Sequence, residues 1–255
     1  LSLLDQISQE MLHPRILSAF NPQALANTLV SCARLDYRNR EFLEGILEEA
    51  AKPYRLKSFQ EQHLANIIWA LGTLKAEQQD QVLAFGQECI MQHRLHRYTP
   101  SDMCNIFMGK SQLRSRLQLF VLQVGIVDSH CCEEAYHVLL HRILHPTDGL
   151  IKKFSPTFCS KLIWALGKLR CTTEDDFEVV LKEAMDPQRI KQYNNQDLSN
   201  IFIGCGKRKF SMKETLSPLL EEVIQPKRLL VYDDQQLANI TWALGEVSHS
   251  VSGRD

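Results

Sequence analysis

The chain has 255 residues, 44% of them hydrophobic and 23% charged, with a formal net charge of −1. These values are typical of a folded globular protein, and no apolar run approaches the roughly 18 residues that a membrane-spanning helix needs. The eight cysteines form no C-x-x-C pair, so the sequence favours reduced thiols in a core over a disulfide framework or a zinc ribbon.

One short phrase recurs six times along the chain. The copies begin near residues 20, 59, 98, 154, 193 and 232, and they read FNPQALANTLVSCARL, FQEQHLANIIWALGTL, YTPSDMCNIFMGKSQL, FSPTFCSKLIWALGKL, YNNQDLSNIFIGCGKR and YDDQQLANITWALGEV. Successive copies are 39 residues apart, except that the third and fourth are separated by 56, which indicates an insertion of 17 residues within about 114–145. Such a period predicts helical repeats that stack and present a continuous surface, and that rarely enclose a catalytic pocket.

Each copy carries the start signals of an α-helix, the first helix of a repeat. An aromatic residue is followed by a good N-cap residue in five copies, and then by Pro in three. Small residues recur one before, four after and six after an aligned reference residue. Because Gly disfavours a helix by about 0.8–1 kcal/mol relative to Ala, its recurrence predicts close approach of neighbouring helices. The six reference residues are Asn27, Asn66, Asn105, Lys161, Asn200 and Asn239.

A second helix is expected after most first helices, from the spacing of apolar residues, at about 40–51, 78–92, 174–185 and 212–224. Pro53, Pro187 and Pro226 lie at one distance from their reference residues, and each is expected to stop the second helix before a link. Pro14 fits the same position, so residues 1–13 resemble a second helix whose first helix is missing. The C-terminus follows a first helix directly. We therefore expect the array to be part of a longer chain, or its ends to be disordered or covered by a partner.

A polar stripe is expected along the first helices, because the reference residue shares a helix face with the positions four before and seven after it. For the recurring Asn we favour a structural role, in which it bonds the backbone or the next Asn along the stack. The alternative is direct contact with a base, as in helical repeats that read one base each. The candidates on this stripe are Asn66, Asn105, Lys161, Lys168, Asn200, Lys207 and Asn239.

The position three before the reference residue varies most, and includes His63, Asp102 and Gln236. Variable sites on a fixed polar background are how modular proteins distinguish ligands, so these side chains are better candidates for ligand contact than the recurring Asn. The three tryptophans share another position, which Val, Met or Ile fills in other copies. We interpret it mainly as a packing site, with a stacking platform for bases as the minor alternative.

Arginine recurs 28 residues after the reference residue in four repeats, and neighbouring cations extend a basic edge along the links. Acidic residues gather instead on the second helices. Cations at fixed pitch could follow a phosphate backbone, but a cation near a helix C-terminus also complements the helix dipole, and the two interpretations carry equal weight. The candidate phosphate contacts are Arg55, Arg94, Arg189, Arg228, Lys57, Arg97, Lys152 and Lys153.

Three histidines in the insertion, His137, His141 and His145, have a spacing that can chelate zinc on one helix face. The companions of an H-E-x-x-H site are absent, so metal binding is a weak alternative. The sequence contains no P-loop, no G-x-G-x-x-G, no nucleophile elbow and no convincing nucleophile–base pair. We therefore expect no enzyme, no cofactor and no small-molecule substrate.

The pattern Phe-x-Pro-Gln-x-Leu-Ala-Asn-x-x-Trp-Ala-Leu-Gly-x-Leu resembles the octotricopeptide repeat of green algae. It is also similar to the heptatricopeptide-type repeats found beside RAP domains in protists, and residues 59–74 and 232–245 match best. The resemblance implies an RNA-binding α-solenoid in an organelle, with a mitochondrion favoured over a chloroplast. Members of these families act in transcript stabilisation, processing and translation, and some are subunits of organellar ribosomes.

Together these features predict an all-α, right-handed solenoid of about six 39-residue helix-turn-helix repeats, forming a single array over residues 1–255. The leading expectation is an organellar RNA-binding protein, with phosphates on the basic links, bases near the polar stripe, and other proteins of a ribonucleoprotein complex as further partners. No membrane is expected. The alternative is a structural subunit of a large organellar complex that holds proteins together without reading bases.

Overall fold

The computed structural model describes residues 2–113, 138–144, 150–169, 173–210 and 213–252. All regular structure in these ranges is helical, which confirms the predicted all-α class. The chain divides into two compact units, Leu1–Tyr136 and His137–Asp255, and each is described by itself. Within the described ranges, no helix has the length and apolar character needed to cross a membrane.

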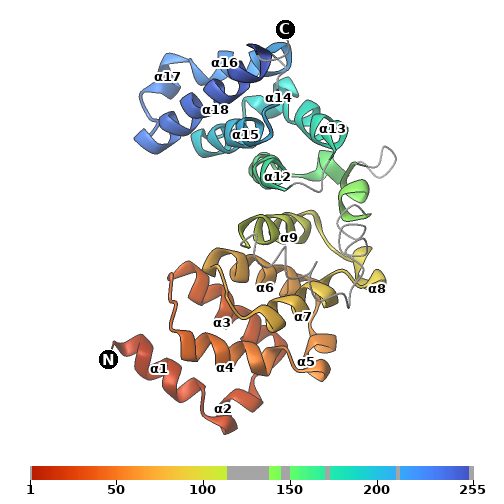
Figure 1. Ribbon diagram of the computed structural model, residues 1–255, viewed down its shortest axis with the longest axis vertical. Coiled ribbons are helices and arrows are strands. Elements are labelled where there is room, and N and C mark those ends of the chain that lie inside the picture. Colours follow the sequence, from red (N-terminus) through yellow and green to blue (C-terminus); the bar gives the residue numbers. More distant parts are fainter. Residues whose placement is uncertain (1, 114–137, 145–149, 170–172, 211–212, 253–255) are drawn as a thin grey trace. The chain divides into compact units, whose positions relative to one another are not determined.

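The first unit alternates two kinds of long helix with short ones (Figure 1). The first helices are α3 (Pro22–Arg34), α6 (Glu61–Leu74) and α9 (Pro100–Gln112). The second helices are α1 (Leu3–Met11), α4 (Arg40–Ala50) and α7 (Gln79–Cys89), and each is followed by a short link helix, α2 (Pro14–Ala19), α5 (Pro53–Ser58) or α8 (Gln92–Leu95). Helix α6 packs against both α3 and α9, so the first helices of this unit form one layer.

The second unit has the same order of elements after a short 3-10 helix, η1 (Leu150–Lys153). Its first helices are α12 (Pro156–Lys168), α15 (Asn195–Arg208) and α18 (Asp234–Ser252). Second helices α13 (Glu174–Ala184) and α16 (Lys213–Val223) lead into link helices α14 (Pro187–Ile190) and α17 (Pro226–Leu229). Helix α15 packs against both α12 and α18, and the predicted second helices are confirmed to within a few residues.

The links differ from the prediction, because they are themselves short helices rather than simple connections. Pro14, Pro53, Pro187 and Pro226 each occupy the first position of a link helix. The N–H of that position has no partner within the helix, so Pro can stop one helix and begin the next without losing a hydrogen bond. In α8, Gln92 takes the place of Pro.

The predicted N-caps of the first helices are confirmed. In α3 the Oδ1 atom of Asn21 accepts a hydrogen bond from the backbone N–H of Ala24 at 2.8 Å. This bond satisfies one of the N–H groups that a helix leaves without a partner at its start. The same bond is made by Thr99, Ser155, Asn194 and Asp233.

Neighbouring first helices approach closely at the small residues, as predicted. A Cβ atom added to Gly72 of α6 would lie 2.7 Å from the Cα atom of Gly109 in α9. In the second unit, a Cβ atom added to Gly167 of α12 would lie 2.6 Å from the Cα atom of Gly204 in α15. These separations are far inside ordinary van der Waals contact, so the glycines set the spacing of the first-helix layer.

Candidate nucleic-acid interface

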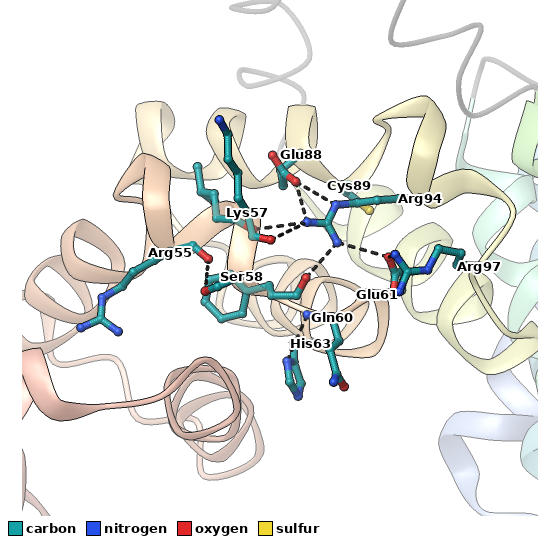
Figure 2. A network of polar contacts seen from close by, with 12 residues as sticks. Arg55, Lys57, Ser58, Gln60, Glu61, His63, Glu88, Cys89, Arg94 and Arg97 are labelled. Atoms are coloured by element: carbon teal, nitrogen blue, oxygen red, sulfur yellow. Dashed lines mark hydrogen bonds and ion pairs between the residues drawn. The ribbon is translucent and has the colours of Figure 1, made fainter.

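Arg94 lies at the centre of a buried polar cluster between two repeats of the first unit (Figure 2). Its Nε donates to Oε1 of Glu88 at 2.8 Å, and its Nη1 donates to the carbonyl oxygen of Phe59 at 2.8 Å. Nη1 also donates to Oε1 of Glu61, and Nη2 to the carbonyl oxygen of Lys57, both at 3.3 Å. The guanidinium therefore joins the second helix and link of its own repeat to the link of the preceding one.

The same fork of contacts occurs at three further arginines, Arg55, Arg189 and Arg228. Each pairs with a glutamate six residues earlier, at N–O distances of 2.6, 3.1 and 2.5 Å respectively. Each Nη1 also donates to a carbonyl oxygen 35 residues earlier, at 2.6, 2.7 and 2.8 Å. The glutamates are Glu49, Glu183 and Glu222, and the carbonyls belong to Phe20, Phe154 and Tyr193. We call this arrangement the arginine fork.

The arginine fork corrects the expectation that these four residues contact phosphate. Their N–H groups are used inside the chain and their side chains are buried or nearly so, so a phosphate could reach them only by breaking contacts between repeats. The helix-dipole interpretation agrees better with the structure. Arg55 and Arg94 donate to the carbonyls of Phe20 and Phe59, which are the C-cap residues of link helices α2 and α5. The sequence does contain a signal for this arrangement, because a glutamate stands six residues before the arginine in all four repeats.

The other cations of the predicted basic edge stay at the surface. Lys57, Lys152 and Lys153 are exposed. Arg97 is also exposed, and its Nη1 lies 3.3 Å from Oε1 of Glu61 (Figure 2). These four side chains are accessible to an anionic ligand, whereas the arginines beside them in the links are not.

At several repeats the variable position serves the start of the first helix, a structural role that competes with the ligand contact predicted from the sequence. Asp102 is buried, and its Oδ2 accepts from the backbone N–H of Thr99 at 2.9 Å and from its hydroxyl at 2.7 Å. His63 and Gln236 likewise accept from the backbone N–H three residues earlier, each at 3.3 Å. Burial lowers the pKa of His63. In these helices the residue three after the N-cap completes a capping box, so a polar side chain at this position also has a structural reason.

Where α6 meets α9, the recurring Asn bonds the next Asn along the stack, which is the structural role that we favoured from the sequence. Asn105 Nδ2 donates to Oδ1 of Asn66 at 3.0 Å, and both side chains are half-buried. In the second unit the amides pair along each helix, with Gln196 donating to Asn200 at 3.1 Å and Gln235 donating to Asn239 at 3.0 Å. The two glutamines are exposed and the two asparagines are half-buried, so these side chains lie at the surface of the layer.

Two lysines of the polar stripe lie over tryptophan rings, a pairing that the sequence did not reveal. On α12, Lys168 Nζ is 3.7 Å from the centre of the Trp164 ring. On α15, Lys207 Nζ is 4.7 Å from the centre of the Trp242 ring, which belongs to the next first helix. Trp164 is half-buried and Trp242 is 39% exposed, so both rings pack against the layer and keep an accessible part.

We call these residues, with the polar side chains beside them, the lysine–tryptophan stripe. In proteins that bind single-stranded nucleic acid, cations contact phosphates and aromatic rings stack on the faces of bases. The amides of this stripe can in addition form hydrogen bonds with base edges. Glu246 follows Asn239 by seven residues on α18, so it places an acidic side chain on the same helix face. The stripe comprises Lys161, Trp164, Lys168, Asn200, Lys207, Asn239 and Trp242.

The metal hypothesis falls mostly outside the described residues, which exclude His137 and His145. His141 is exposed in the helical segment 138–144, and no group of three potential metal ligands occurs within the described ranges. The cysteines that the structure describes are all buried and form no disulfide with one another, as favoured from the sequence. Burial raises the pKa of Cys32 and of Cys159 to about 11, so these thiols stay protonated at neutral pH.

The chain matches no known protein-family model, and no curated protein is significantly similar to it. The resemblance to octotricopeptide-type repeats stays a prediction based on the recurring motif.

Proposed function

We propose that the chain is a right-handed α-solenoid of about six repeats that binds single-stranded RNA along its first helices. Two observations support the architecture: both units have the same order of first, second and link helices, and the first helices pack in sequence within each unit. The resemblance to organellar helical repeats supports a location in a mitochondrion, or else a chloroplast, where the protein would be part of a ribonucleoprotein complex and would also contact other proteins.

The observation that carries the proposal is the lysine–tryptophan stripe of the second unit. Lys168 and Lys207 would contact phosphates, while Trp164 and Trp242 would stack on bases. The half-buried amides of Asn200 and Asn239 would reach base edges. Because every base has a face that can stack, this surface would bind many sequences and show only modest preferences. The exposed link cations could extend the phosphate path, but the arginine forks contribute only to the fold.

Removing the two lysines should weaken RNA binding mainly at low salt. The logarithm of affinity for single strands falls with the logarithm of salt by about 0.7 per neutralised phosphate, so a Lys168→Ala/Lys207→Ala variant should lose about 1.4 from this slope. The measurement is fluorescence anisotropy of a labelled, mixed-sequence, single-stranded RNA at several salt concentrations. Lys182→Ala is the matched control, because this exposed lysine lies on α13 beside Glu178 and away from the first-helix layer.

Removing the exposed ring should act differently, by a loss of affinity with little change in salt dependence. Trp242→Ala is expected to reduce the binding free energy by about 1–3 kcal/mol, the usual contribution of one stacked base. Circular dichroism of each variant checks that the helices are retained. RNA affinity that is absent, or that does not change with salt, would contradict the proposal and favour the protein-binding scaffold instead.

A further inference from the structure

The lysines of the lysine–tryptophan stripe cover the rings that base stacking requires. Lys168 Nζ lies 3.7 Å from the centre of the Trp164 ring, and Lys207 Nζ lies 4.7 Å from the centre of the Trp242 ring. Both lysines are exposed, so each lies over the side of its ring that a ligand approaches from solvent. A base that stacks on that side has to take the place of the ammonium group.

The contact between an exposed ammonium group and a ring is weak, because it comes only from the attraction of the charge to the electron-rich ring face. A phosphate oxygen carries a formal negative charge and accepts hydrogen bonds from the same ammonium group, which is a stronger interaction. The flexible lysine stem allows the ammonium group to move from the ring to a phosphate without any change in the backbone. A phosphate therefore removes the cover from the ring, and an uncharged ligand does not.

The first unit has a tryptophan at the same position without a lysine on its own helix. Trp69 of α6 aligns with Trp164, and Thr73 aligns with Lys168. The hydroxyl of Thr73 donates to the carbonyl oxygen of Trp69 at 2.9 Å, so this side chain turns to the helix backbone. The repeat therefore folds without a lysine at this place. Trp69 is only half-buried although α6 packs between α3 and α9, so a neighbour on each side does not close the ring position.

We propose that Lys168 and Lys207 make base stacking conditional on phosphate, so that this surface selects strands with a charged backbone. In the free protein each lysine covers its ring. A phosphate of the strand draws the ammonium group away, and the uncovered ring stacks on the neighbouring base. A neutral ligand has no differential affinity for the uncovered state, so it shifts this equilibrium less. The inference rests on the proposed RNA binding and adds the coupling between its two kinds of contact.

Uncovering the rings by mutation should strengthen the binding of an uncharged strand. The probe is a labelled morpholino oligonucleotide, which carries bases on a neutral backbone, with the same mixed sequence as the RNA. In fluorescence anisotropy, Lys168→Ala/Lys207→Ala should bind it more tightly than the unchanged chain, by about 2- to 5-fold for each uncovered ring, as expected for loss of an exposed cation–π contact. The same variant should bind RNA less tightly at low salt, so the two strands respond in opposite directions.

An anion without bases should uncover the rings of the unchanged chain. Acrylamide quenches tryptophan fluorescence according to the accessibility of the ring. Tripolyphosphate should therefore increase the quenching, because it draws the lysines from the rings, whereas a ligand that covers a ring would decrease it. In Lys168→Ala/Lys207→Ala the quenching should be high without the anion and should not change when the anion is added. Sodium chloride at the same ionic strength is the control for salt.

Two further variants show that the position of the lysine matters. Lys182→Ala is the matched control, because this lysine pairs with Glu178 on α13, and it should behave like the unchanged chain toward both strands and tripolyphosphate. Lys168→Arg retains a cation that stacks on an aromatic face, so it should keep the ring covered and the affinity for the morpholino strand low. Circular dichroism of each variant checks that the helices are retained.

The outcomes separate this inference from the proposed function. If the unchanged chain binds RNA but the double variant gains no affinity for the morpholino strand, the lysines are phosphate contacts only and the coupling is wrong. Quenching that decreases or stays constant with tripolyphosphate would overturn the coupling as well, because the anion would not have uncovered the rings. Absence of RNA binding by the unchanged chain would instead overturn the proposed function, and this inference with it.

Discussion

Replacing Arg94 by Ala is expected to lower the free energy of unfolding of the first unit by about 3–5 kcal/mol, the usual cost of breaking a buried ion pair from one side. The guanidinium is 4% exposed. Its loss would leave Glu61 and Glu88 without their buried counter-charge, and would leave the carbonyls of Lys57 and Phe59 without a donor. Urea unfolding followed by circular dichroism measures the change.

Two further variants separate the fork from simple loss of charge. Arg97→Ala removes a cation from the same link, but its side chain is 64% exposed and should change stability by no more than about 1 kcal/mol. Arg94→Lys should recover little, because an ammonium group cannot reach a carboxylate and a carbonyl in the same planar geometry. Equal effects of Arg94→Ala and Arg97→Ala would contradict the structural role of the fork.

Gly109→Ala is expected to destabilise the first unit, by about 1–3 kcal/mol as for other overpacked sites. The added Cβ atom would lie 2.8 Å from the backbone nitrogen of Trp69 and closer still to the carbonyl group of Ile68. Helix α9 would have to move away from α6, because a neighbouring backbone cannot turn aside as a flexible side chain can. The expected sign is opposite to that of the intrinsic preference, which favours Ala over Gly in a helix by about 0.8–1 kcal/mol.

Gly86→Ala provides the matched control, since its Cβ position in α7 is open, and it should stabilise the protein. Gly204→Ala should repeat the loss in the second unit, where the added atom would lie 2.6 Å from the carbonyl oxygen of Ile163. Chemical unfolding of the three variants under one set of conditions is the measurement. A neutral or stabilising Gly109→Ala would mean that the first helices lie farther apart than the structure shows.

Local chemistry explains which parts of the fold were readable from the sequence. The starts of the first helices follow from their N-caps, and the ends of the second helices from Pro53, Pro187 and Pro226. Both signals act within a few residues. The short link helices were missed because Pro was interpreted only as a residue that ends a helix, although it is equally suited to begin one.

The candidate site was harder to predict from the sequence, because a polar residue that recurs at a fixed position can contact either a ligand or the neighbouring repeat. Arg94 and Asp102 both looked available from the sequence, and both are used by the fold. Whether a side chain faces inward depends on how adjacent helices are offset, and periodicity does not give that offset. For the same reason, the contact between Lys207 and Trp242 appears only once two neighbouring helices have been placed.

The arginine fork recognises carbonyl oxygens of the preceding link, not its side chains. Every amino acid supplies a carbonyl oxygen, so this contact between neighbouring repeats does not depend on which residues the link contains. Mutation can therefore alter the outward side chains at these places, as the difference between Ser18 and Lys57 illustrates, while the spacing of the scaffold is preserved. An internal contact that recurs in this way allows the outward side chains of each repeat to vary independently.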